Sequence, residues 1–88
     1  MRYRAVFSKE VTRALGKLKK KDRPTFRRVE RLIEKVLEHP ELGKPLRYDL
    51  KNHRRESVGS FVLVYEFRGD TILFADYDHH DNVYRKWH

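Results

Sequence analysis

The residues best suited to chemistry lie near the C-terminus, where the consecutive histidines His79 and His80 are followed by Tyr84. Histidine donates or accepts a proton near neutral pH, and a tyrosine hydroxyl can take part in the same transfers. In an extended segment two consecutive side chains diverge, so only one histidine is expected to react. The stretch predicts acid–base catalysis; the alternatives are surface histidines in an acidic turn and a tyrosine of the core.

Two adjacent arginines, Arg54 and Arg55, supply positive charge of the kind that binds phosphate groups. They fall in a predicted strand, so they point to opposite faces and at most one of them lines a given groove. Arg47 and Lys51 precede them in the chain. The alternative for all four is an ordinary solvated surface.

A metal site is a competing interpretation of the C-terminal stretch. Oxygen and nitrogen ligands come from Asp76, Asp78, His79, His80 and Asp81, which lie within six residues. Asp76, Asp78 and His80 would share one face of a strand. A second, spaced set of ligands is absent from the sequence, so we expect neither a metal nor another cofactor.

The net charge of +8 is unevenly distributed. Through Leu50 the chain has 15 lysines and arginines against 7 acidic residues, and from Lys51 onward it has 6 of each. The positive excess therefore belongs to the first half, which would attract an anionic partner over a long range. The alternative is the solvated helical surface of a basic protein.

The N-terminal part predicts a strand followed by a helix. Residues 2–7 alternate between two sides, as in a strand with one buried face. Ser8 is suited to cap a helix that continues to about Lys20. Gly16 is unfavourable inside a helix and indicates close packing against the sheet or the next helix. The apolar positions recur at helical spacing: Val11, Ala14, Leu15 and Leu18.

A second basic helix follows. Pro24 suits its first turn, and the helix must stop near His39 because Pro40 disfavours helical geometry in the residue before it. The two helices should pack as a hairpin on a sheet. Residues 41–52 have no sustained period and are predicted to form a loop. The apolar stripe of the second helix consists of Phe26, Val29, Leu32, Ile33, Val36 and Leu37.

Three strand-like runs complete the fold: residues 53–58, 61–67 and 71–77. Gly59-Ser60 and residues 68–70 form tight turns between them, which predicts an antiparallel meander. Residues 81–88 form a short helix or lie extended. Trp87 either closes the core, which is the preferred interpretation, or stacks on a base. The fold class is therefore α+β, with an N-terminal strand, a helical hairpin, a three-stranded antiparallel meander in one small sheet and a short C-terminal segment.

Length and composition limit the class of protein. Eighty-eight residues with 39% hydrophobic content allow one small core, so we expect a single domain over residues 1–88. Cysteine is absent, which excludes disulfides and indicates a cytoplasmic location. No apolar run approaches the roughly 20 residues of a membrane span, and residues 1–7 lack the apolar centre of a signal peptide.

The order of the predicted elements resembles the RelE/ParE toxin superfamily over nearly the whole chain. Three local matches carry the resemblance. Leu46-Arg47 precedes the second strand of the family, and residues 55–65 resemble its meander motif with the sequence Arg-Glu-Ser-Val-Gly-Ser-Phe-Val-Leu-Val-Tyr. Near the end, His79-His80 followed by Val83-Tyr84 is similar to the family's histidine-arginine and hydrophobic-tyrosine pairs. The chain is identified as a RelE-like toxin domain.

The sequence also departs from the family at three cations. Ser57 and Val62 stand where the family often has arginines, and His80 stands where many members have the arginine nearest the reaction. The protein then either uses other residues for cleavage or cleaves weakly.

The resemblance implies the toxin of a type II toxin–antitoxin system, an endoribonuclease that cleaves messenger RNA on the translating ribosome. Such cleavage needs no metal, because the 2′-hydroxyl beside the scissile phosphate attacks it. The enzyme supplies a base for that proton, cations for the phosphate and a donor for the leaving 5′-oxygen. The implied catalytic residues are His80, which we prefer, His79, Tyr84 and Arg55. The implied RNA-binding residues are Arg47, Lys51, Arg54, Lys17, Lys20, Lys21, Arg27 and Arg28.

The partners implied are a RelB-like antitoxin, messenger RNA and the ribosome, with operator DNA bound only through the antitoxin complex and no membrane. Two alternatives stay open. The chain could be a ParE-like inhibitor of DNA gyrase, or a catalytically weakened toxin that acts as a binding and repressor partner.

Overall fold

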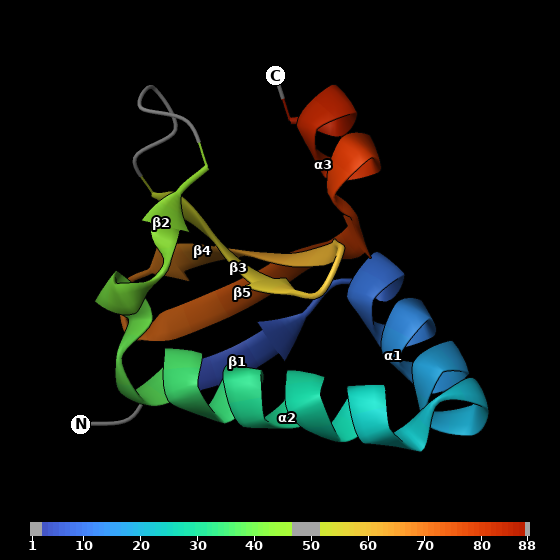
Figure 1. Ribbon diagram of the computed structural model, residues 1–88. Helices are drawn as coiled ribbons and strands as arrows, with labels where there is room; N and C mark the ends of the chain where they lie inside the picture. The colour runs from blue at the N-terminus through green and yellow to red at the C-terminus, as the bar shows by residue number, and fades with distance from the viewer. Residues whose placement is uncertain (1–2, 47–51, 88) are drawn as a thin grey trace.

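The computed structural model describes residues 3–46 and 52–87, shown in Figure 1. It confirms the predicted α+β order of a strand, two helices, a strand meander and a short C-terminal helix. The elements are β1 (Arg4–Phe7), α1 (Lys9–Lys21), α2 (Arg23–Glu38), the 3-10 helix η1 (Pro40–Leu42), β2 (Lys44–Pro45), β3 (His53–Val58), β4 (Phe61–Arg68), β5 (Thr71–His79) and α3 (His80–Lys86).

All strands join one sheet in the order β1-β5-β4-β3-β2. The β1 strand pairs with β5 in parallel, and the other neighbours are antiparallel. The parallel pairing arises because α1 and α2 and the meander return the chain to the edge where it started. In Figure 1, α1 and α2 lie on one side of the sheet and α3 rises from the other.

Polar side chains fix where the two long helices begin. The hydroxyl of Ser8 accepts a hydrogen bond from the Val11 N–H at 3.1 Å, as the sequence predicts for the cap of α1. Asp22 caps α2 in the same way, accepting from the backbone and the hydroxyl of Thr25 at 3.2 and 2.7 Å. These bonds from Thr25 hold the pKa of Asp22 below its ordinary value. The α2 helix ends with His39 as its C-cap.

The sheet carries a separate hydrophobic core on each face. The larger core fills the space between the sheet and α1 and α2, and it contains Val11, Val29, Ile33, Val36, Leu37, Val58, Leu63, Tyr65, Ile72, Phe74 and Tyr77. The smaller core lies under α3 and contains Leu46, Val62, Val64 and Val83, with Trp87 packed against it. Trp87 therefore closes a core, as predicted. No helix within residues 3–46 and 52–87 has the length and apolar character needed to cross a bilayer.

Three details of the fold differ from the sequence prediction. All four residues of β1 are exposed, because β1 is an edge strand, although Phe7 stacks on the buried Phe74 at 5.2 Å. The predicted loop of residues 41–52 contains most of η1 and the strand β2. Strand β5 also continues two residues beyond Tyr77 to His79, so the tail helix begins directly at the strand end.

One buried hydroxyl ties the segment before β2 to the sheet. Tyr65 donates a hydrogen bond to the Pro40 carbonyl oxygen at 2.6 Å and accepts one from the Gly43 N–H at 3.0 Å. Burial raises the pKa of Tyr65 to about 12. Because β2 has only two residues, these bonds are needed to hold it beside β3.

Glycine substitutions provide a test of this packing. A Cβ at Gly16 would contact nothing within 4 Å, so the expectation of close packing there is wrong. We predict that Gly16→Ala raises the free energy of unfolding in urea by roughly 0.5–1 kcal/mol, because alanine favours the helix. Gly43→Ala should lower it by about 2 kcal/mol, because the new Cβ would overlap the Tyr65 hydroxyl. Loss of stability in the Gly16 variant would contradict the structure.

Candidate active site at the end of the sheet

The candidate site forms where β5 passes directly into α3. His79 is the last residue of β5 and the N-cap of α3, and its Nδ1 accepts a hydrogen bond from the Asp81 N–H at 3.2 Å. The rings of His79 and His80 lie 4.4 Å apart. The expected divergence of these side chains is wrong, because the backbone turns from strand to helix between them.

His80 pairs with a carboxylate. Its Nδ1 lies 2.9 Å from Oδ1 of Asp81, and its side chain is 47% exposed. With Nδ1 beside the carboxylate, Nε2 of the imidazole can accept a proton from another molecule, and the carboxylate stabilises the imidazolium that results. His80 thus has the arrangement of a general base.

Tyr84 lies between His80 and a cation. The centroid of its ring is 6.5 Å from the centroid of the His80 ring. The same centroid is 5.6 Å from the guanidinium carbon of Arg55. Tyr84 is 45% exposed, so it is not the core aromatic that the alternative interpretation required.

Arg55 carries a positive charge that the described part of the chain does not neutralise. Its Nε atom is buried and has no hydrogen-bond acceptor, and no ion pair engages the guanidinium within residues 3–46 and 52–87. A partly buried cation without a carboxylate partner is costly unless an anion binds it. We call the face of the sheet that carries α3 the open face. Beneath Tyr84 this face is therefore suited to hold a phosphate.

Arg54 has a different role. Its guanidinium donates to the Gly43 carbonyl oxygen at 2.6 Å and lies 5.7 Å from the ring of Phe67, which packs against the larger core. The predicted placement of Arg54 and Arg55 on opposite faces is confirmed. Arg54 thus ties the segment before β2 to the sheet from the face opposite to Arg55.

A cluster of polar contacts attaches α3 to the sheet. Lys86 lies 2.8 Å from Oδ2 of Asp76 and 3.2 Å from Oδ2 of Asp78. The indole N–H of Trp87 donates to Asp76 at 3.2 Å, and the Asn82 amide donates to Asp78 at 3.2 Å. We call the Asp76–Asp78–Lys86 arrangement the α3 clamp. It fixes α3 and, with it, the ring of Tyr84 above Arg55.

The carboxylate of Asp78 in the α3 clamp is held in its charged form. Burial acts to raise its pKa, but hydrogen bonds from Asn82, from the His79 N–H and from Lys86 outweigh burial, and the pKa lies below its ordinary value. For Lys86, burial acts to lower the pKa, and the bonds to Asp76 and Asp78 raise it overall.

The structure divides the five residues considered as metal ligands into two groups. Asp76 and Asp78 bind Lys86 in the α3 clamp. The ligand atoms of His79, His80 and Asp81 lie within 4.8 Å of one another. These three side chains could approach one cation, whereas the five do not form a common site.

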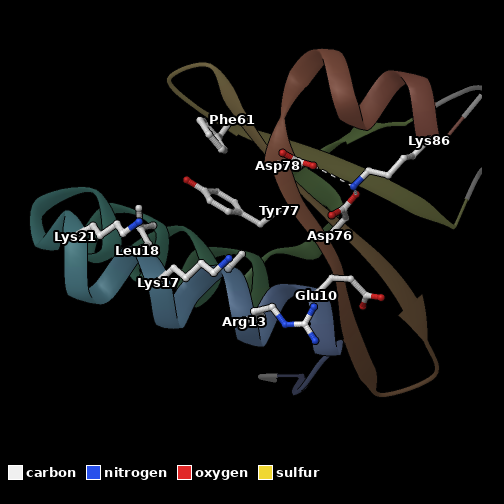
Figure 2. A pocket seen from close by; sticks show the side chains of 11 residues that line it. Glu10, Arg13, Lys17, Leu18, Lys21, Phe61, Asp76, Tyr77, Asp78 and Lys86 are labelled. Carbon is white, nitrogen blue, oxygen red and sulfur yellow. Dashed lines mark hydrogen bonds and ion pairs between the residues drawn. The ribbon is translucent and has the colours of Figure 1, made fainter.

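The predicted RNA-binding residues lie on several surfaces. Lys17 and Lys21 line a groove of about 440 Å³ beside α1 and the end of β5, shown in Figure 2. Arg27 and Arg28 line a second hollow, of about 510 Å³, along α2. Lys20 is exposed on α1. Of the other three, Arg54 lies on β3, and Arg47 and Lys51 lie outside the described residues.

The sequence analysis did not assign several residues to the candidate site. Asp81 orients His80, and Lys86 with Trp87 anchors α3. Asp81 could have been found from its place in the first turn of a helix that begins at two histidines. The pairing of Lys86 with Asp76 joins residues ten apart, and no local pattern predicts it.

Comparisons with known proteins identify the family of the chain. Residues 5–84 match the family model described as the ParE toxin of the type II toxin–antitoxin system parDE. A protein of Methanocaldococcus jannaschii named RelE4, assigned as a toxin, is 36% identical over 75 residues, which make up 82% of this chain and 80% of the relative. A chain in the solved toxin–antitoxin complex RelBE2 of Mycobacterium tuberculosis has a TM-score of 0.72 and 24% identity, covering 90% of this chain and 99% of that chain.

The fold and these relatives define a small toxin of the RelE/ParE superfamily. The chain belongs to the ParE toxin family and is the toxin of a type II toxin–antitoxin system.

The α3 clamp makes a pH-dependent contribution to stability. A carboxyl group whose folded-state pKa is lowered stabilises the fold above its unfolded pKa, and this contribution disappears as the pH falls through the folded value. We predict that Asp78→Asn lowers the free energy of unfolding by about 1 kcal/mol at pH 7 and by almost nothing at a pH well below 3.8. Urea unfolding followed by the emission of Trp87, the single tryptophan, measures the difference. In a Lys86→Ala background the effect of Asp78→Asn should shrink; an undiminished, pH-independent effect would contradict the clamp.

Proposed function

We propose that this toxin is an endoribonuclease that cleaves messenger RNA on the translating ribosome, in the cytoplasm, without a metal ion. The observation that supports the proposal is the position of Tyr84, whose ring centroid lies 5.6 Å from the guanidinium carbon of Arg55 and 6.5 Å from the ring of His80. Arg55 has no ion pair among the described residues, and His80 lies against the carboxylate of Asp81. A protein that only binds a partner has little need of proton-transfer groups close to a cation.

The proposed reaction uses His80 and Arg55, which both lie near the ring of Tyr84. Nε2 of His80 takes the proton of the 2′-hydroxyl, and Asp81 stabilises the imidazolium that forms. The freed 2′-oxygen bonds to the phosphorus, and the bond from phosphorus to the 5′-oxygen breaks. Arg55 stabilises the charge that grows on the phosphate oxygens, and Tyr84, whose ring covers Arg55, donates a proton to the leaving 5′-oxygen. The products carry a 2′,3′-cyclic phosphate and a 5′-hydroxyl.

The remaining cations suit the binding of the larger RNA. Lys20, Arg27 and Arg28 are exposed on α1 and α2. We propose that this surface lies against ribosomal RNA, and that Arg47 and Lys51 bind phosphates of the messenger. Binding through such contacts weakens steeply as the salt concentration rises.

The proposed partner of the free toxin is a RelB-like antitoxin, through which the pair would bind operator DNA. Support comes from the fold relative, whose solved structure is a toxin–antitoxin complex. The net charge of +8 favours an acidic partner.

Inhibition of DNA gyrase is the second candidate function. The description of the matching family as ParE toxin favours it. Two residues agree with that candidate, because Ser57 and Val62 replace arginines of the nuclease relatives, and Val62 is buried in the core under α3. A weakened toxin that serves as a repressor partner would share these features.

Primer extension on messenger RNA in a translating extract tests the proposed nuclease. We predict cuts at codon-phased positions that disappear when translation is blocked. His80→Ala should reduce cutting about 100-fold, because a general base is lost, and Arg55→Ala should also reduce it strongly. His39→Ala is the matched control, since His39 is an exposed histidine at the end of α2, and it should cut normally. Absence of cuts together with inhibited DNA supercoiling would favour the gyrase inhibitor.

A further inference from the structure

A continuous series of half-exposed rings surrounds the end of the sheet. From the open face, Tyr84 is followed by His80, His79 and Phe61, with ring centroids 6.5, 4.4 and 5.8 Å apart in turn. The exposed fractions of Phe61 and Tyr84 are 40% and 45%, and those of the His79 and His80 side chains are 39% and 47%. A contiguous set of exposed rings indicates a binding surface, because most of the ring area of a folded protein is buried.

Phe61 places one end of this series in the groove beside α1. Its ring stacks on Tyr77 at 5.3 Å and 25°, and both rings line the groove of about 440 Å³. Figure 2 shows Phe61 and Tyr77 facing the side of α1 that carries Lys17 and Lys21. The groove therefore presents an aromatic platform next to two cations, and it begins one ring away from the candidate catalytic histidines.

The charges of the groove are partly paired. Asp76 and Asp78 both bind Lys86. Lys17 and Lys21 of α1 line the groove across Tyr77 from Phe61 (Figure 2) and form no ion pair within the described residues. Glu10 and Arg13 also line the groove. An anionic group is thus favoured on the side of the groove formed by Lys17 and Lys21.

We propose that Phe61 is a base-stacking platform for single-stranded RNA, and that Lys17 and Lys21 bind the adjoining phosphate. The inference rests on the proposed nuclease, whose substrate strand then passes around the end of the sheet from Arg55 and Tyr84 to this groove. Aromatic platforms beside cations bind single strands with little sequence preference, because every base has a face that can stack. Phe61 is thus a positioning residue that holds the nucleotide next to the scissile phosphate.

Binding of an uncleavable strand tests this inference apart from catalysis. The probe is a short 2′-O-methyl oligouridine with one 2-aminopurine, whose emission falls when the base stacks. We expect Phe61→Ala to weaken binding about tenfold and to abolish the quenching, and Phe61→Tyr to retain both. The slope of log K against log salt concentration should become less negative by about 0.7 in each of the variants Lys17→Ala and Lys21→Ala.

Phe7 provides the matched control. It is 41% exposed and stacks on Phe74 at 5.2 Å and 17°, so Phe7→Ala removes a similar ring and a similar contact on the edge strand β1. Its binding should equal that of the wild type. Equal binding by Phe61→Ala, equal loss in both variants or no binding by the wild type would overturn the inference.

Cleavage by the wild-type protein, measured in parallel, separates this result from the proposed function. If the wild type cuts RNA but Phe61→Ala binds the probe as well as the wild type does, the proposed nuclease stands and the platform is excluded. Phe61-dependent binding without any cutting would support the platform and exclude the nuclease.

Discussion

The attachment of α3 to the open face of the sheet is the interaction on which the candidate site depends. Lys86 reaches back from the end of α3 to Asp76 and Asp78 of β5, and the Trp87 indole adds a hydrogen bond to Asp76. The α3 helix has only seven residues, too few for a stable helix on its own. Without the α3 clamp the ring of Tyr84 would not stay above Arg55, and the orientation of His80 would not be fixed.

The two faces of the sheet have different surroundings, and this difference explains the different contacts of Arg54 and Arg55. On the face covered by α1 and α2, Arg54 binds backbone carbonyl oxygens and supports the short strand β2. On the open face, one residue later, Arg55 lies beneath Tyr84 and has no ion pair in the part of the chain that the structure describes. The alternation of a strand thus separates a structural cation from a cation available to a ligand. The half-exposed rings connect both faces around the strand ends.

Much of the fold follows from local patterns in the sequence. The helical stripes, the Ser8 cap and the turns at Gly59 and Gly69, which both have positive φ, predict the elements to within a few residues. Strand β2 was missed because two residues give no period and are held by the distant Tyr65 hydroxyl. The sequence indicated the residue types of the candidate site, but not how their side chains lie relative to one another. The adjacency of the two histidine rings depends on a strand-to-helix turn, and the α3 clamp on contacts between separate elements.

The chemical ends of the RNA products test the central claim, metal-free cleavage at the Arg55–Tyr84–His80 site, most directly. Mass spectrometry of messenger fragments made by the purified toxin in a translating extract should find a 2′,3′-cyclic phosphate on one fragment and a 5′-hydroxyl on the other. A messenger with a single 2′-deoxynucleotide at the cut position should stay intact there. Fragments with a 3′-hydroxyl and a 5′-phosphate, or cutting of the deoxy-substituted position, would contradict the account, because water and not the 2′-oxygen would then be the nucleophile.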